Sequence, residues 1–452
     1  MIKHIFWVKE HRRTLSRLAL GAVTILGIGS CGGSDLVSEG PIEAAVEPAS
    51  AIQSVPAKRA DEFVNSIGTN IHLGYFGTPY ATGWSSIVKP KILALGIRHV
   101  RDIGVVVNDD TWMNIVYGRM KELSDRGIKF NLVMRPAEGV TNYTHVNHFT
   151  RLMQYAAPVV ESFEGLNEHD LSKRAAWATE ARTFQQALYA KLKSDSRTAT
   201  LPVFGPSMGK PANAALVGSL SAYMNYGAIH PYPGGKEPSA ALSYHQTNVL
   251  PLSGSKKLVA TESGYHTAMS WTSDHPPVSE AAMARYVPRL FLEYFQAGIP
   301  RSWLYEFIDQ GTDQTHREQH FGLLRANGSE KPVYVALKNV ITVFKDPGSS
   351  FPPGPLSYGL AGQTTNVRQL LLQKRDGKFY LVLWQGVSSY NLTTKLDVPV
   401  APKPVTVQLS AAARQVRLFT PLTSQNSVWQ AVNVSSFPVS VPDHPVVVEI
   451  TR

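Results

Sequence analysis

The stretch SFEGLNEHD, residues 162–170, joins a short and mostly apolar run to a group of acidic and amide side chains. Ser162–Leu166 is followed at once by Asn167 and Glu168. A buried parallel strand that ends in a polar loop has this pattern, and so does an apolar segment that enters a solvated loop. Whether similar runs recur along the chain decides between these two interpretations.

Seven further short runs of this kind recur within residues 61–337, often bounded by Gly or Pro. Amphipathic segments separate them, and in one of these Ala181, Phe184 and Leu188 keep one face at helical spacing. Eight strand-and-helix repeats predict a (β/α)₈ TIM barrel, a fold of ~250 residues. The predicted strands are Ser66–His72, Ile97–Arg101, Ile128–Val133, Ser162–Leu166, Pro202–Pro206, Tyr226–His230, Leu258–Glu262 and Arg301–Tyr305.

The sequence pattern changes in residues 338–452. Helical periodicity is lost there, and runs in which apolar and polar residues alternate appear. The sequence KRDGK, residues 374–378, separates two such runs and is typical of a hairpin. We therefore predict a C-terminal all-β sandwich, which makes the chain α/β with a second domain. Its predicted strands are Arg368–Gln373, Phe379–Trp384, Val405–Leu409, Gln415–Phe419 and Val446–Ile450.

The N-terminus has the order of an export signal. A basic segment, residues 9–17, precedes the apolar stretch Leu18–Ile28, which is short for a membrane span. Cys31, the single cysteine of the chain, follows in the sequence IGSC. An ordinary signal peptide and an uncleaved anchor are the alternatives to a lipoprotein signal over residues 1–30. Residues 31–60 are rich in Gly, Ser, Ala, Glu and Pro and predict a flexible tether.

The sequence IGSC resembles the lipobox of bacterial lipoproteins. The resemblance implies that Cys31 is lipidated and becomes the new N-terminus, which anchors the exported protein to a membrane. Gly32, and not Asp, follows the cysteine, which favours the outer membrane in a host that has one. A lipidated Cys31 leaves no thiol for disulfides or for cysteine catalysis.

Charge and motifs exclude several classes of protein. The formal charge of +10 falls to +6 without the +4 of residues 1–30, and the basic residues are dispersed. This favours a solvated surface over a nucleic-acid interface. The sequence has no Gly-rich phosphate loop, no Cys/His metal spacing and no dinucleotide fingerprint, so we expect no metal and no other cofactor.

Two carboxylates stand where predicted strands end. Glu168 follows the fourth run, and Glu262 ends the seventh in LVATESGYH, residues 258–266. The loops after barrel strands share one face, so the pair is expected on the same rim. Hydrolysis of a glycosidic bond needs such a pair, with one acid that protonates the leaving oxygen and one carboxylate that attacks the anomeric carbon or activates water.

GLNEHD, residues 165–170, and ATESGYH, residues 260–266, resemble the acid/base and nucleophile motifs of clan A retaining glycoside hydrolases. IGTNIHLGY, residues 67–75, HVRDIG, residues 99–104, and the trailing sandwich look most like family 39, with families 5 and 30 as neighbours. The resemblance covers residues 61–452. It implies that Glu168 is the acid/base and Glu262 the nucleophile of a double displacement with retention.

The same resemblance implies roles for residues around the pair. Asn167 would donate to the sugar 2-hydroxyl. His230 and Tyr232, in IHPYPGG, match a His-x-Tyr motif whose tyrosine holds Glu262, and Arg101 matches an arginine that supports the nucleophile. The alternative for Arg101 is a salt pair with another barrel carboxylate.

Further rim residues are predicted to bind substrate. Trp303, in SWLYEF, is the candidate platform under the sugar, with Tyr305 as its rival and barrel core as the alternative. His72 resembles a position that lines the sugar site, and a hydrogen-bonded rim histidine that binds no ligand is the alternative. Glu306 and Asp309 are expected to contact substrate or to brace loops, and either is a rival for Glu262.

Two more features of the barrel segment have open interpretations. Glu164, inside the fourth strand, needs a buried partner and is read as a support for the site. The loop after the first strand is rich in aromatic residues, which either form a polysaccharide groove or pack the loop down. These residues are Tyr75, Phe76, Tyr80 and Trp84.

The sequence therefore predicts a retaining glycosidase that is lipid-anchored at the outer membrane, in the periplasm or on the cell surface. A polysaccharide or oligosaccharide is the expected substrate, and endo action on exopolysaccharide or cell-wall glycan is preferred because the anchor keeps the enzyme beside polymer. We expect a monomer. The alternatives are a catalytically silent carbohydrate-binding lipoprotein on the same scaffold and a transglycosylase.

Overall fold

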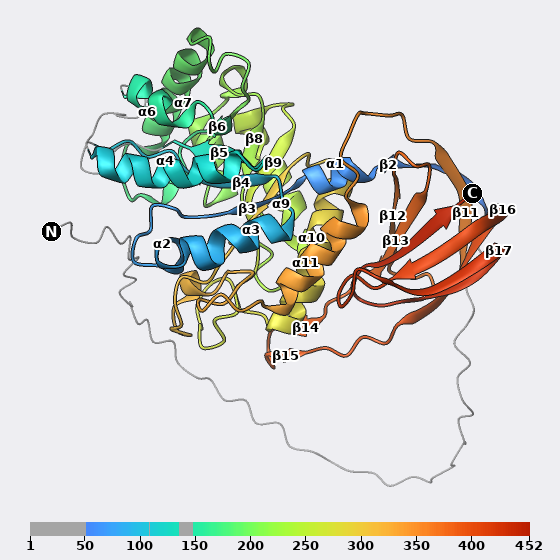
Figure 1. The fold of residues 1–452 in the computed structure, drawn as a ribbon. Coiled ribbons are helices and arrows are strands. Elements are labelled where there is room, and N and C mark those ends of the chain that lie inside the picture. Colours follow the sequence, from blue (N-terminus) through green and yellow to red (C-terminus); the bar gives the residue numbers. More distant parts are fainter. Residues whose placement is uncertain (1–50, 108, 135–147) are drawn as a thin grey trace, which may run out of the picture. The chain divides into compact units, whose positions relative to one another are not determined.

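The computed structural model describes residues 51–107, 109–134 and 148–452, and within them eight parallel strands form a barrel (Figure 1). The strand order is β7-β6-β5-β4-β3-β10-β9-β8, and a parallel bridge between Phe204 and Tyr226 joins the two ends. Each strand overlaps one predicted run, so the (β/α)₈ prediction is confirmed. The strands are β3 (Ile67–Asn70), β4 (His99–Ile103), β5 (Lys129–Val133), β6 (Val160–Glu164), β7 (Val203–Phe204), β8 (Gly227–Ile229), β9 (Leu258–Ser263) and β10 (Ser302–Leu304).

Helices connect the strands because each crossover between parallel neighbours needs a covering element. Asp109 caps α4 by accepting a hydrogen bond from the Trp112 amide at 3.1 Å. The helices are α1 (Ala60–Asn65), α2 (Pro79–Thr82), η1 (Trp84–Val88), α3 (Lys89–Leu95), α4 (Asp110–Ser124), α6 (Phe149–Ala156), η2 (His169–Leu171), α7 (Trp177–Ser194), η3 (Pro211–Asn213), α8 (Ala214–Val217), η4 (Ser221–Tyr223), η5 (Pro238–Ala241), α9 (Leu242–Ser253), α10 (Glu280–Gln296), η6 (Arg317–Gln319) and α11 (Pro332–Phe344).

The C-terminal sheet runs in the order β1-β11-β16-β18-β13-β12-β2, with β17 paired to β16. The first half of β16 pairs with β11 and its second half with β18, and the register shifts between Gln408 and Ala413. A long strand that changes partners in this way lets the sheet fold over its own core, and the predicted all-β sandwich is confirmed. The strands are β1 (Gln53–Pro56), β2 (Lys58–Arg59), β11 (Pro355–Gly362), β12 (Val367–Gln373), β13 (Phe379–Gln385), β16 (Lys403–Phe419), β17 (Ser427–Val441) and β18 (Val446–Thr451), besides the small pair β14 (Tyr390–Asn391) and β15 (Leu396–Asp397).

The sheet packs on the barrel through α10 and α11, which lie beside β12 and β13 in Figure 1. Trp384 of β13 donates to Glu293 of α10 at 3.1 Å, and Tyr380 meets Phe344 of α11 at a ring distance of 6.0 Å. The opposite face of β13 enters the sandwich core. Both faces of β13 are therefore covered, which explains why its sequence FYLVLWQ is an almost unbroken apolar run.

Three boundary predictions are wrong. Residues 53–59, predicted as part of the tether, form β1 and β2 and pair with β11 and β12. Helix α11 continues through Phe344, so the barrel does not end at Leu337. The two predicted strands within residues 405–419 are one strand, and β17 was missed. The cause is long-range pairing, which local composition does not encode.

The predicted signal sequence, Cys31 and most of the predicted tether lie outside the described residues. Among the helices that the described ranges contain, none combines the length and apolar character needed to cross a membrane.

Because three histidines are buried, we expect the protein to lose stability in acid. Burial lowers the pKa of His72, His245 and His266 to about 4 each, whereas an unfolded histidine titrates near ~6.5. Below that value the unfolded chain binds protons that the folded chain does not, so the free energy of unfolding falls as the pH drops toward 4. Each histidine is expected to contribute about 1 kcal/mol per pH unit in this window.

Urea denaturation at pH 7.5 and pH 5.0 measures this effect. His230 acts in the opposite direction, because its raised pKa stabilises the folded chain most at low pH and this contribution is lost as the pH rises through it. We therefore compare how much free energy of unfolding wild type and the His245→Gln variant, substituted on α9, each lose between pH 7.5 and pH 5.0. The variant is expected to lose about 2 kcal/mol less than wild type between the two pH values. An identical loss in both proteins contradicts the prediction.

Candidate active site

Arg101 of β4 lies at the centre of a network of buried polar side chains and donates hydrogen bonds to several of them. Its guanidinium donates to both carboxylate oxygens of Glu164, at 2.8 and 2.9 Å, and to one oxygen of Glu262 at 2.7 Å. It also donates to the amide oxygens of Asn70 at 2.8 Å and Asn167 at 2.6 Å. Burial opposes its charge, but the two carboxylates outweigh burial and raise the Arg101 pKa. Arg101 therefore stays cationic and holds both acids by charge-assisted bonds.

Glu164 is fully buried, and its partners are the ones that a buried carboxylate requires. Besides Arg101, Asn131 donates to it at 2.7 Å, and Ser162 in turn donates to Asn131 at 2.8 Å. The prediction that Glu164 supports the site is consistent with this arrangement. Sequence analysis missed Asn70 and Asn131, although a polar amide inside a short apolar strand was a signal that could have found them.

Glu262 is the penultimate residue of β9, has both carboxylate oxygens engaged and is 9% exposed. Arg101 binds one oxygen, and the Tyr232 hydroxyl donates to the other at 2.8 Å. Burial and the Glu262 charge raise the pKa of Tyr232 well above its ordinary value, so the phenol keeps its proton and remains a donor. The two bonds fix the orientation of Glu262.

Glu168 stands at the start of η2 in a left-handed backbone conformation, with φ 45° and ψ 41°. Positive φ is uncommon for a residue other than glycine and is found disproportionately at functional sites. The Glu168 amide donates to the Ser207 carbonyl at 3.1 Å, which ties this turn to the segment after β7. Its side chain is about one quarter exposed (26%), so it is more accessible than Glu262.

His230 lies between the two acids. Its Nδ1 is 2.9 Å from one oxygen of Glu168 and 3.6 Å from one of Glu262, and its Nε2 is 3.1 Å from the Thr261 hydroxyl. Burial lowers the His230 pKa, but the charges of Glu262 and Glu168 outweigh burial and raise it. One oxygen of each acid and a ring nitrogen of His230 all lie within 4.8 Å of one another.

Glu168, His230 and Glu262 are the one group in the described ranges whose acidic and imidazole atoms approach closely enough to hold a metal ion. The surrounding charges do not suit a cation, because Arg101 lies 2.7 Å from Glu262 and Tyr232 donates to its other oxygen. Arg101 and Tyr232 therefore already bind both oxygens of Glu262, the atoms that a metal ion would need.

The predicted platform at Trp303 is wrong. Trp303 is fully buried with Phe204, Ala228 and Val259 in the interior of the barrel, and a Cβ added at Gly68 would lie 2.6 Å from its ring. Tyr305, its rival, lies past the end of β10 and is half-buried. The Tyr305 ring is 6.4 Å from that of Tyr232 and 5.5 Å from that of His72, which places Tyr305 in the wall of the site.

The predicted substrate contact of Glu306 is also wrong. Glu306 is fully buried, and Tyr80 and Gln310 donate to it at 2.9 and 3.0 Å. Burial raises its pKa well above the ordinary value. Glu306 therefore braces the loops after β3 and β10, which was the alternative role.

His72 and Asp309 complete the predicted set. His72 is 8% exposed, lies 3.3 Å from Glu306 and is neutral near pH 7, because burial lowers its pKa to about 4. Asp309 pairs with the buried Lys331 at 2.9 Å and accepts from the Gly322 amide at 2.7 Å. Asp309 is committed to this loop, so it does not rival Glu262.

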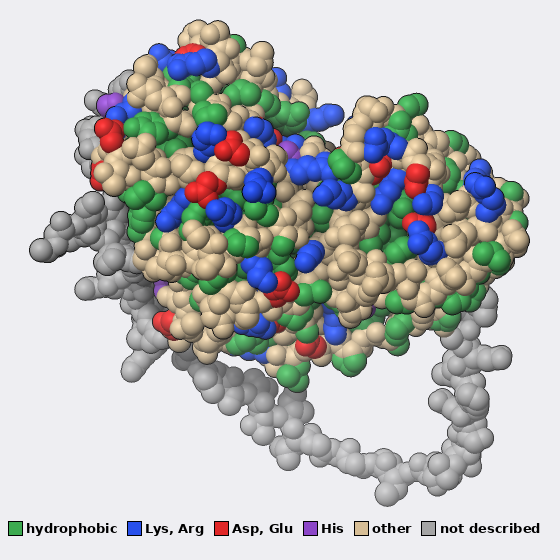
Figure 2. Space-filling view, in the orientation of Figure 1, with side chains coloured by type: hydrophobic (Ala, Val, Ile, Leu, Met, Phe, Trp, Pro, Cys, Tyr) green, Lys and Arg blue, Asp and Glu red, His purple; other side chains and the backbone are tan. Residues whose placement is uncertain are grey.

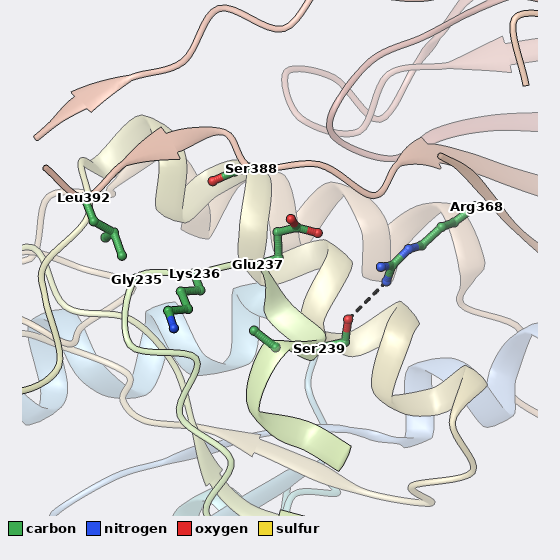
Figure 3. A pocket seen from close by; sticks show the side chains of 8 residues that line it. Gly235, Lys236, Glu237, Ser239, Arg368, Ser388 and Leu392 are labelled. Atoms are coloured by element: carbon green, nitrogen blue, oxygen red, sulfur yellow. Dashed lines mark hydrogen bonds between the residues drawn. The ribbon is translucent and has the colours of Figure 1, made fainter. Parts of the chain in front are cut away.

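Two clefts lie apart from the acid pair. One of about 380 Å³ separates η5 from the C-terminal sheet, and in it Arg368 donates to Ser239 at 3.1 Å (Figure 3). The other, of about 420 Å³, borders Asp309 and His320. On the face shown in Figure 2, positive side chains are interspersed with negative ones. The expectation that the protein does not bind nucleic acid stays a prediction.

Comparisons with known proteins find the same fold. A family 39 glycoside hydrolase from Bacteroides cellulosilyticus WH2 has a TM-score of 0.58 at 15% identity, over 88% of this chain and 83% of that one. A monomeric beta-xylosidase from Caulobacter crescentus CB15 has a TM-score of 0.56 at 14% identity, over 88% and 97%. A glucosidase from Croceicoccus marinus gives 0.56 at 10% identity, over 88% and 97%. No family model and no curated protein matches the chain.

These similarities show that the chain has the barrel-and-sandwich architecture of glycoside hydrolases such as family 39. At 10–15% identity they establish the fold alone, and the activity has to be argued from the site.

Proposed function

We propose that this protein is a retaining glycoside hydrolase that acts on a polysaccharide or oligosaccharide. The observation that carries the proposal is the pair of carboxylates, Glu168 and Glu262, with oxygens within 4.8 Å of each other at the carboxyl ends of β6 and β9. Retaining sites have carboxyl groups ~5–5.5 Å apart and inverting sites ~6.5–9.5 Å apart. An oxygen separation of at most 4.8 Å is nearer to the retaining range than to the inverting range, which supports direct attack by one of the acids.

In the proposed reaction Glu168 protonates the glycosidic oxygen while Glu262 attacks the anomeric carbon from the other face of the sugar. The bond to the leaving group breaks, and a glycosyl ester forms on Glu262. Glu168, now ionised, then takes a proton from water, which attacks the anomeric carbon and releases Glu262. The configuration is inverted twice and is therefore retained.

The neighbouring side chains suit these roles. Arg101 and Tyr232 hold Glu262 in one orientation, and the more exposed Glu168 can reach a leaving oxygen. Asn167 is exposed, and its amide oxygen accepts from Arg101, so its NH₂ group is the part of the side chain that can donate to a substrate. That group is available to a sugar 2-hydroxyl, a contact that strengthens in the transition state.

The test is a screen of the full chain against polysaccharides and 4-nitrophenyl glycosides, with the first-formed anomer of the product followed by NMR. We expect hydrolysis with retained configuration, and a loss of activity on unactivated glycans in Glu168→Gln, which cannot donate the proton. Absence of turnover, or a product of inverted configuration, would falsify the proposal.

A further inference from the structure

Two loops of the carboxyl rim are joined directly at Glu168. One is the turn 167–171 after β6, and the other is the segment 205–213 after β7. The Ser207 amide donates to the Leu166 carbonyl at 3.2 Å, and the Glu168 amide donates to the Ser207 carbonyl at 3.1 Å. Both bonds extend the parallel pairing of β6 with β7 beyond the ends of the two strands. The backbone of Glu168 is therefore attached to the neighbouring loop.

Asp170, two residues further along the turn, attaches the same two loops through its side chain. One carboxylate oxygen accepts from the Gly209 amide at 2.9 Å. The other accepts from the Lys210 amide and from the side-chain amide of Asn213, both at 2.9 Å. Because a charged acceptor forms stronger hydrogen bonds than a neutral one, these three bonds hold the turn and the segment together.

Gly209 allows the two loops to approach each other closely. A Cβ added at Gly209 would lie 2.4 Å from Leu171 Cδ1 and 2.6 Å from Leu171 Cγ. Leu171 follows Asp170, so the turn packs against the segment at the place where Asp170 is hydrogen-bonded to it. A residue without a side chain is needed for this close contact.

The backbone conformation of Glu168 requires such support. Its φ of 45° lies in the left-handed region, which a residue other than glycine keeps only where the surrounding structure imposes it. On one side of Glu168, the Asn167 side chain is bound by Arg101 at 2.6 Å, and on the other side Asp170 is bound by the segment after β7. This conformation directs the Glu168 carboxylate into the site, where one oxygen lies 2.9 Å from His230 Nδ1.

We propose that Asp170 is a positioning residue for the general acid. By fastening the turn 167–171 to the segment 205–213, it holds Glu168 in the left-handed conformation and thereby places the Glu168 carboxyl group at the glycosidic oxygen. This inference rests on the proposed function and adds a residue that acts through Glu168. Glu262 is held by separate bonds from Arg101 and Tyr232, so the attack of the nucleophile does not depend on Asp170.

The experiment measures kcat/KM of wild type and Asp170→Ala on the 2,4-dinitrophenyl and phenyl glycosides of one sugar. The dinitrophenyl group leaves with little protonation, whereas the phenyl group needs the general acid. A misplaced Glu168 is expected to lower kcat/KM roughly 10-fold to 100-fold on the phenyl glycoside and much less on the dinitrophenyl glycoside. Asp170→Asn keeps one acceptor oxygen and should lose less than Asp170→Ala. Gly209→Ala, which forces the loops apart at Leu171, should show the same selective loss.

Asp61→Ala is the matched control. Asp61 also accepts three hydrogen bonds, two from Arg98 at 2.7 and 2.6 Å and one from the Asp346 amide at 3.1 Å. It lies on α1, which precedes β3 and is therefore at the opposite end of the barrel. Asp61→Ala should lower stability without changing the ratio of kcat/KM on the two glycosides. In Asp170→Ala, an equal loss on both glycosides, or no loss on either, overturns the positioning role and leaves the proposed function intact.

Hydrogen–deuterium exchange tests the same inference without turnover. In Asp170→Ala the amides of residues 166–171 and 205–210 are expected to exchange faster than in wild type, because the turn opens more often, while those of α10 keep their rates. If wild type hydrolyses no glycoside, the proposed function falls, and faster exchange still supports the fastening of the turn by Asp170. Unchanged exchange in residues 166–171 overturns it.

Discussion

Glu262→Ala is expected to lower hydrolysis by a factor on the order of 10⁴–10⁶, the range found when a covalent nucleophile is removed. The variant has no carboxylate that can form the glycosyl ester, since Glu164 is fully buried behind Arg101. The fold is expected to survive, because Arg101 keeps its two bonds to Glu164. The measurement is kcat on the aryl glycoside and on the best oligosaccharide, with thermal unfolding recorded in parallel.

Glu168→Ala is the matched comparison. An aryl glycoside with a good leaving group needs little protonation, so Glu168→Ala should form the glycosyl ester at a useful rate and then stall before hydrolysis. Added azide can attack that ester and should restore turnover with retained configuration. In Glu262→Ala azide would instead displace the leaving group directly and give the inverted product. Full activity in Glu262→Ala would show that another residue is the nucleophile.

Arg101→Met is expected to destabilise the protein by about 3–5 kcal/mol, the range for breaking a buried ion pair on one side. Glu164 and Glu262, which are 0% and 9% exposed, would both lose their cation. Asn70 and Asn167 would lose a donor to their amide oxygens. Activity should fall as well, because Glu262 would no longer be held in one orientation. Urea denaturation near pH 7 measures the stability.

Arg101→Met combined with Glu164→Gln is the control for this interpretation. The double variant removes the buried charge of Glu164, and the Gln side-chain oxygen can still accept from Asn131. It should recover part of the lost stability but not the lost activity, because Glu262 remains unsupported. Wild-type stability in the single variant would mean that Arg101 does not compensate the buried acids.

Local patterns were sufficient to predict the barrel and the acid pair. Each barrel strand is a short apolar run, and the amphipathic segments between them have helical periods. Glu168 and Glu262 follow directly from this reading, because a residue just past a strand of a parallel barrel has to stand on the carboxyl rim. Which residues bind Glu164 could not be assigned from local patterns, because Arg101 and Asn131 come from other strands and the closed barrel sets their distance from it.

Trp303 and Tyr305 are a case in which the sequence cannot tell which of two aromatic residues lies at the rim of the barrel. They are two residues apart, so both side chains point to the same side of the chain, and spacing alone cannot rank them. What separates them is depth, since β10 ends at Leu304, which leaves Trp303 packed in the barrel interior and Tyr305 at the rim. The stagger of neighbouring strands sets that depth, and it is a property of the closed barrel.

The order of the barrel strands and helices, the two-part architecture and the two acids at strand ends could be predicted from the sequence, because periodicity and strand termini are encoded within a few residues. The tertiary structure was needed to show that residues 53–59 pair with strands some 300 positions later, that Glu306 is buried and that Trp303 packs in the barrel interior. Each of these depends on contacts between segments far apart in the chain, and such contacts are fixed when the barrel and the sheet close.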